Sequence, residues 1–153
     1  MVNTFTVLLS IHVLTAVIWV GGAFLTQIYA IRANHASDPP YMVRFLHETE
    51  FIGTRVFLPA SLILVGTGFW LIAERNWDFE LWIIFALAAW IASVATGAGF
   101  LGPETGRIGA IVEREGASSP AALARIKRIF LISRIELTLL VLIVIDMVIK
   151  PGT

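Results

Sequence analysis

Residues 5–31 read FTVLLSIHVLTAVIWVGGAFLTQIYAI and contain no lysine, arginine, aspartate or glutamate. A helix crosses the hydrocarbon core of a bilayer with about 20 mostly apolar residues, so this stretch is long enough for one span. Three further apolar stretches of sufficient length occupy residues 56–73, 81–101 and 129–149, the last of which carries Arg134, Glu136 and Asp146. The sequence therefore predicts an all-α fold, a single domain in which four transmembrane helices form a bundle.

The composition is that of a membrane protein. Hydrophobic residues make up 58% of the chain and charged residues only 14%, against about 25% charged residues in an ordinary soluble domain. Eleven basic residues balance eleven acidic ones, which leaves no basic surface for nucleic acid. The chain has no cysteine, so disulfides, thiolate metal sites and iron–sulfur clusters are excluded. Nothing basic precedes residues 5–31, which are also too long for the apolar core of a signal peptide, so we interpret them as a retained span.

The basic residues predict the orientation, because cytoplasmic loops keep an excess of lysine and arginine. Nine of the eleven lie on one side, between the first and second spans or around the connection from the third to the fourth. The other side has only Arg75 and Lys150. We expect both termini to face away from the cytoplasm.

The connections carry their own signals. Residues 38–40 read Asp-Pro-Pro, a helix start, and the pattern that follows predicts a cytoplasmic interfacial helix over about residues 40–52. Gly102-Pro103 is expected to kink or end the third span. We expect a further helical stretch before Gly116 and a new helix start at Ser119.

Small residues recur at four-residue spacing in the first and third spans. The third span has Ala88, Ala92 and Thr96 on one face and Ala89, Ser93 and Gly97 on another. Such strips let helix backbones approach closely in lipid. They predict the interior of the bundle, and we expect contact with the lipid bilayer outside it, with self-association or a larger membrane complex as possible assemblies.

His12 is the most distinctive polar residue within a span. An imidazole at this depth can ligate haem iron or copper, relay a proton, or hydrogen-bond a neighbouring helix. We expect it to face the bundle interior beside the fourth span, closer to residues of the second or fourth span than to lipid. Asp146 and Met147, near the end of the fourth span, fall at similar depth, so Asp146 is a candidate acceptor for one ring nitrogen and Met147 a candidate haem or copper ligand.

A second polar group lies at the other end of the spans. Arg55, Arg134, Glu104 and Glu136 are expected to form ion pairs between helices there. Two arginines on facing helices also suit haem propionates or a phospholipid head group. His35 and His47, about a bilayer thickness from His12, are expected to be surface residues.

The motif in residues 11–22, His12 followed after six residues by Trp19 and then by Gly21-Gly22, resembles the first helix of bacterial membrane proteins in the copper-resistance D and HemJ-type protoporphyrinogen oxidase group. The chain is most similar to an uncharacterised branch of small four-span integral membrane proteins, and residues 53–57 and 67–68 share in the likeness. The resemblance implies haem binding at His12 and a place in the bacterial inner membrane. HemJ-type proteins also use a lysine in a later span, whereas Lys127 and Lys150 lie outside the apolar stretches here.

These observations predict a membrane protein that binds a b-type haem or related tetrapyrrole through His12, for electron transfer or a step of haem metabolism. Copper is the alternative metal at His12. The competing functions are a transporter or accessory subunit in which His12 and Asp146 relay a proton or metal ion, and a structural assembly factor. Whether the protein is an enzyme stays open at this point.

Overall fold

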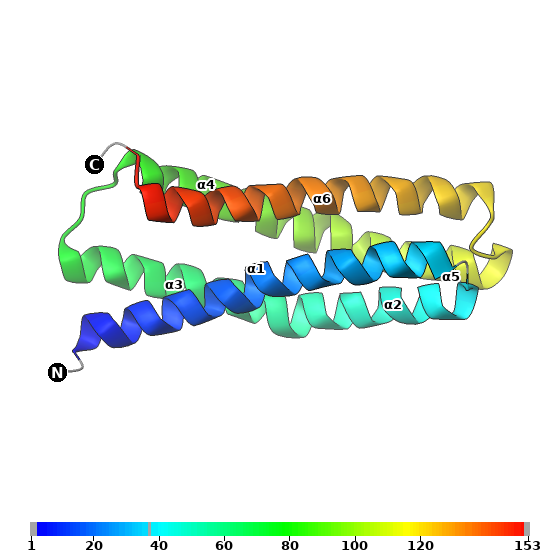
Figure 1. Cartoon of the computed structure of the whole chain (residues 1–153), viewed down its shortest axis with the longest axis horizontal. Helices are drawn as coiled ribbons and strands as arrows, with labels where there is room; N and C mark the ends of the chain where they lie inside the picture. Colours follow the sequence, from blue (N-terminus) through cyan, green and yellow to red (C-terminus); the bar gives the residue numbers. More distant parts are fainter. Residues whose placement is uncertain (1–2, 37, 152–153) are drawn as a thin grey trace.

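The computed structural model describes residues 3–36 and 38–151, and these residues form helices and turns without any β-strand. The helices make four long rods that lie side by side (Figure 1). The first rod is α1 (Thr4–Ala36) and the last is α6 (Pro120–Ile149). The second joins α2 (Pro39–Ile52), the π-turn η1 (Gly53–Phe57) and α3 (Leu58–Arg75), and the third joins α4 (Leu81–Thr96), the π-turn η2 (Gly97–Leu101) and α5 (Gly102–Glu115).

Three of the rods are long and apolar enough to cross a membrane: Thr4–Ala36, Pro39–Arg75 and Leu81–Glu115. The all-helical prediction is thus confirmed. The rod α6 is not among the three, and its apolar stretch carries Arg134, Glu136 and Asp146. The fourth span and the orientation of the bundle stay predictions.

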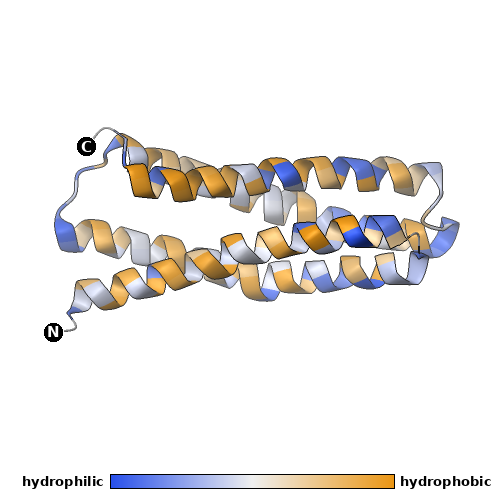
Figure 2. Cartoon of the chain, viewed as in Figure 1, coloured by the Kyte–Doolittle hydropathy of each residue, from blue (hydrophilic) through white to orange (hydrophobic). Residues whose placement is uncertain are grey.

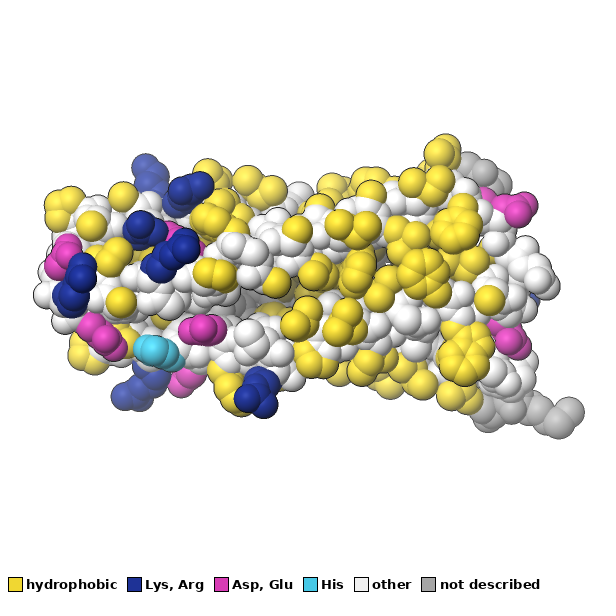
Figure 3. All heavy atoms as spheres, turned by 180° about the vertical axis from the view of Figure 1, so that it is seen from behind, with side chains coloured by type: hydrophobic (Ala, Val, Ile, Leu, Met, Phe, Trp, Pro, Cys, Tyr) yellow, Lys and Arg dark blue, Asp and Glu magenta, His cyan; other side chains and the backbone are white. Residues whose placement is uncertain are grey.

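The rods are longer than a bilayer is thick. The second rod has 37 residues and measures about 55 Å at 1.5 Å rise per residue, against about 30 Å of hydrocarbon. Polar residues gather at the end of the bundle away from the first turn of α1 and the last turn of α6 (Figure 2). On the face drawn in Figure 3 most of the charged side chains gather at the same end, and apolar side chains are spread over the rest, with a few acidic side chains at the far end.

We call the polar end the extension; it comprises the last turns of α1, all of α2 and α5, and the first turns of α6. Its interior is a cluster of buried apolar residues of the kind found in soluble proteins. The cluster consists of Ala33, Met42, Leu46, Ile108, Val112, Ala122, Ile126 and Ile129. The remainder of the bundle, which we call the apolar half, has large apolar side chains on its outside, as a lipid-facing surface requires.

The helix predicted over about residues 40–52 differs from the expectation in what covers its apolar face. The helix forms, but α2 runs along the bundle axis and continues through η1 into α3. Its buried residues Met42 and Leu46 join the core of the extension. The apolar face that suggested a membrane surface is instead covered by α5 and α1.

Each π-turn is followed after one residue by a proline, at Pro59 and at Pro103. A proline inside a helix lacks an N–H and its ring clashes with the carbonyl four residues earlier. The π-turn shifts the bonding by one residue, with Leu58 N–H donating to the Gly53 carbonyl and Gly102 N–H to the Gly97 carbonyl. This wider turn lets the helix pass the proline without ending, so Gly102-Pro103 does not end the third rod.

The two predicted helix boundaries between the third and fourth rods are confirmed. Gly116, with φ of +85°, ends α5 because this left-handed conformation is favourable only for glycine. The Ser119 side chain accepts a hydrogen bond from the Ala122 N–H at 3.2 Å and caps α6.

Candidate functional site

His12 projects from α1 onto α3. Its Nδ1 lies 2.9 Å from the Leu64 carbonyl oxygen and 3.2 Å from Thr67 Oγ1. The Thr67 hydroxyl already donates to backbone carbonyls of its own helix, so Nδ1 carries the proton and the Leu64 carbonyl accepts it. The lone pair is then on Nε2, which has no hydrogen bond to any described residue.

Gly68 makes this close approach possible. A Cβ atom at Gly68 would lie 3.3 Å from His12 Cε1, which is tighter than ordinary side-chain packing. The absence of a side chain at this position lets the imidazole lie against the backbone of α3. The ring is therefore held by a hydrogen bond on one side and by close packing on the other.

The His12 side chain lines a cavity of about 630 Å³ in the apolar half, which we call the His12 cavity. Ligand cavities are usually of about 300–1,000 Å³ and mostly apolar. Residues of α1, α3, α4 and α6 form the wall, and most of them are aliphatic or aromatic. The imidazole is one of few polar groups on this wall.

Two further residues with ligand chemistry line the same cavity. Met147 of α6 lines it, so a thioether and the imidazole share one space. Trp90 of α4 lines it as well, and its indole Nε1 is buried with no acceptor among the described residues. A buried N–H without an acceptor is costly.

Basic residues lie at the end of this cavity. Lys150 lines it, with its ammonium 4.7 Å from the ring centre of Trp77 and 5.1 Å from that of Trp82. The Arg75 guanidinium lies 3.9 Å from the ring centre of Phe5, another lining residue. These two are the basic residues that depart from the asymmetry of the sequence, and both are near one site.

Asp146 does not join His12. It is buried on α6, but it does not line the His12 cavity, and its Oδ2 has no hydrogen-bond partner among the described residues. The expectation that Asp146 accepts from the His12 ring is therefore wrong, because the Leu64 carbonyl takes that place. His12 and Asp146 were placed at similar depth along their helices, but residues at similar depth need not lie on helix faces that meet.

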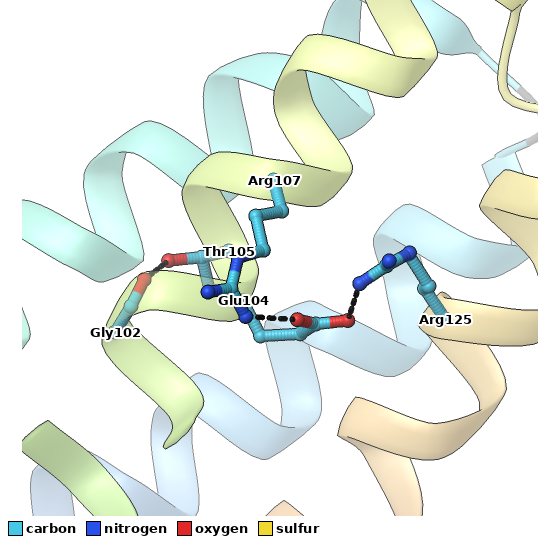
Figure 4. A network of polar contacts seen from close by, with 5 residues as sticks. All are labelled: Gly102, Glu104, Thr105, Arg107 and Arg125. Carbon is cyan, nitrogen blue, oxygen red and sulfur yellow. Dashed lines mark hydrogen bonds and ion pairs between the residues drawn. The ribbon is translucent and has the colours of Figure 1, made fainter. Parts of the chain in front are cut away.

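Arg55 and Arg134 are exposed and make no ion pair with the described residues. Glu104 pairs instead with Arg125 at 2.6 Å and with Arg107 at 3.4 Å (Figure 4). The predicted pairing of these two arginines with Glu104 and Glu136 is wrong. The partners of buried Glu104 are Arg107, one turn further along α5, and Arg125, which lies before Arg134 on α6, and both are in the extension.

Glu136 has a different partner from the one expected, since its Oε1 accepts a hydrogen bond from Ser93 Oγ at 2.8 Å. Neither Arg55 nor Arg134 lines the His12 cavity, so neither is placed to meet haem propionates there.

His35 and His47 are exposed, as predicted. Within the part of the chain that the structure describes, no group of three or more histidine, cysteine, aspartate or glutamate residues could hold a metal ion.

The fold and composition define a multi-pass α-helical integral membrane protein. The chain belongs to the family described as predicted integral membrane protein (DUF2269), whose model matches residues 6–151. The expected membership of an uncharacterised membrane protein family is confirmed, whereas the likeness to copper-resistance D and HemJ-type proteins stays a prediction. No curated protein and no solved structure matches the chain.

Proposed function

We propose that this protein binds a b-type haem or a related tetrapyrrole in the His12 cavity and serves electron transfer or a step of haem metabolism. We further propose that α6 is the fourth span, that both termini face away from the cytoplasm, and that the membrane is the bacterial inner membrane. The observation that carries the proposal is the state of His12, whose proton is held by the Leu64 carbonyl while Nε2 has no partner.

This arrangement suits a metal-ligating histidine. Such residues almost always donate the second ring N–H to a carbonyl or carboxylate, which fixes the tautomer and the ring orientation. The Leu64 carbonyl does this for His12, and Gly68 lets the ring pack against α3. The chain therefore presents a lone pair in a fixed direction without needing Asp146.

The rest of the cavity fits a flat apolar ring system with acidic groups at one edge. Its aliphatic and aromatic wall excludes water from the macrocycle. Met147 would hold the haem iron together with His12, and Lys150 and Arg75 would bind the propionates in place of the expected Arg55 and Arg134. The Trp90 N–H would donate to a carboxylate or carbonyl oxygen of the ligand. When bound, the haem would supply a one-electron Fe(III)/Fe(II) couple.

The relay between His12 and Asp146 is the weaker candidate. The two side chains do not hydrogen-bond each other, and Asp146 lies outside the cavity that His12 lines. A copper ion at His12 and Met147 would have few protein ligands, and it would leave most of a cavity of about 630 Å³ unfilled.

The test is the absorption spectrum of the protein purified in mild detergent from cells supplied with a haem precursor. We expect a Soret band in the wild type and its loss in His12→Ala. The matched control is His35→Ala, which removes an exposed histidine outside the cavity and should leave the band unchanged. A wild type that carries no tetrapyrrole after reconstitution, or a His12→Ala variant with an unaltered band, would refute the proposal.

A further inference from the structure

A second cavity, of about 430 Å³, lies among the four rods, and we call it the Glu136 cavity. Residues of α1, of α2 and η1, of η2 and α5, and of α6 line it. Trp19 and Leu140 line this cavity and the His12 cavity alike, so they form the shared wall between two separate spaces.

The polar lining of this cavity is acidic, without a compensating base. Glu136 and Glu50 line it, and no lysine, arginine or histidine does. Glu136 accepts one hydrogen bond, from Ser93, and has no ion pair within the described part of the chain. An ionised carboxyl at such a position in a membrane protein is costly unless a cation lies beside it.

A donor in the same cavity also lacks a partner. Gln27 Oε1 lies 3.0 Å from Ser133 Oγ, a hydroxyl that also lies 3.1 Å from the Phe130 carbonyl oxygen. Gln27 Nε2 is buried and has no acceptor among the described residues. The cavity is thus lined from α6 by a carboxyl that has no ion pair among the described residues, and from α1 by Gln27, whose Nε2 has no acceptor among them.

Both π-turns border this space, with Gly53 and Phe57 of η1 and Gly97 of η2 in its lining. Single π-turns within α-helices are frequent at functional sites. The two turns begin with glycines six residues before their prolines, Gly53 before Pro59 and Gly97 before Pro103. The two helices are thus interrupted in the same way on two neighbouring rods that border one cavity.

Aromatic rings complete the wall. Trp19, Phe45, Phe57 and Phe130 line the cavity. The faces of such rings attract cations, with the effect growing as water is excluded. A metal ion is disfavoured, because the described residues offer no group of three or more typical ligands and the space is far larger than one ion.

We propose that the Glu136 cavity binds a small organic cation, a protonated amine that also carries a hydrogen-bond acceptor. Glu136 is the counter-ion of the ammonium group, the aromatic rings hold the apolar part, and Gln27 Nε2 donates to the acceptor. This site is independent of haem binding, since it shares only a wall with the His12 cavity.

The experiment is calorimetric titration of the full chain in non-ionic detergent with three probes of similar shape and different charge. Phenethylamine should bind, whereas its neutral analogue 2-phenylethanol and its anionic analogue phenylacetate should bind at least about tenfold more weakly, the loss of one charge-assisted hydrogen bond. If 2-phenylethanol bound as tightly as phenethylamine, the cavity would select only for apolar shape and the proposal would be overturned. The absence of phenethylamine binding would overturn it as well.

Variants locate the site. Glu136→Gln, which keeps an oxygen for the Ser93 hydroxyl, should weaken phenethylamine binding about tenfold or more. Asp146→Asn removes a buried carboxyl of the same helix outside this cavity and should change nothing. 2-Amino-1-phenylethanol, which adds an acceptor, should bind more tightly than phenethylamine to the wild type but not to Gln27→Leu. Unaltered binding in Glu136→Gln would overturn the assignment.

Discussion

The extension and the apolar half are built from the same four rods but stabilised in opposite ways. Ile108, in the core of the extension, is 0% exposed, whereas Val148 in the apolar half is 78% exposed. In water the burial of such side chains drives packing, and in lipid it does not. The apolar half therefore relies on side chains packed closely against glycines, as Phe57 against Gly22 and His12 against Gly68, and on hydrogen bonds between rods, as between His12 and Leu64.

The comparison also explains where the candidate sites are. A core packed for the hydrophobic effect leaves few voids, and the residues of the extension core are nearly all inaccessible. The apolar half can leave space between rods, because its outer surface needs no burial. The His12 cavity lies wholly in this half, and the Glu136 cavity lies where the two halves meet around the π-turns.

Reporter fusions that test the orientation of the two halves in the membrane are expected to show the largest effect. The nine basic residues on or near the extension predict that it is cytoplasmic. Alkaline phosphatase fused after Thr153 should be active, and green fluorescent protein fused there should be dark. The reverse pattern would place the extension outside the cytoplasm and contradict the proposed topology.

The two kinds of packing can be separated by deleting matched apolar groups. Ile108→Ala in the extension should lower the free energy of unfolding by about 2–5 kcal/mol, because it leaves a cavity in a closed core. Val148→Ala, which removes methyl groups from an exposed side chain, should cost less than about 0.5 kcal/mol. Thermal unfolding in detergent compares the two variants, and equal losses would mean that the halves do not differ in this way.

Close packing in the apolar half is tested at the glycine pair of α1. A Cβ atom at Gly22 would overlap the ring of Phe57, whereas one at Gly21 would meet nothing within 4 Å. Gly22→Ala should therefore destabilise the protein by about 1–3 kcal/mol. Gly21→Ala should be neutral or stabilise it by up to about 1 kcal/mol through helix propensity. The prediction fails if both substitutions have the same effect on thermal unfolding.

The smallest effect is expected at the ion pairs of the extension. Arg125→Ala removes the 2.6 Å partner of buried Glu104, and we expect a loss of about 1 kcal/mol, because the Arg125 side chain is itself partly exposed to water and Arg107 still pairs with Glu104. Arg114→Ala breaks an exposed pair with Glu115 and should cost at most about 0.5 kcal/mol. A similar small loss in both variants would show that the Glu104 pair adds nothing beyond a surface pair.

The helices and their ends were largely predictable, because apolar length, Gly116 and Ser119 are local signals. The course of α2 was not, since a single apolar face looks the same whether lipid or another helix covers it. Neither were the π-turns predicted, although Gly53 and Gly97 each stand six residues before a proline. That shared spacing is a signal visible in the sequence.

The candidate site was predictable only in part. His12 stands out as a polar residue within an apolar span, but its partner is a backbone carbonyl, which leaves no mark in the sequence. Helix depth suggested Asp146, and only the rotation of α6 about its axis shows that Met147 faces the cavity instead. Lys150 and Arg75 could have been found from the sequence, because they are the two basic residues on the side where basic residues are rare.

Rescue of a His12→Gly variant by free imidazole tests the assignment of His12 as the haem ligand most directly. The variant leaves the cavity and its other residues in place, so imidazole can occupy the vacated position. We predict that His12→Gly loses the Soret band of the wild type, that imidazole restores it, and that His47→Gly needs no imidazole. A band that persists in His12→Gly without imidazole would contradict the account.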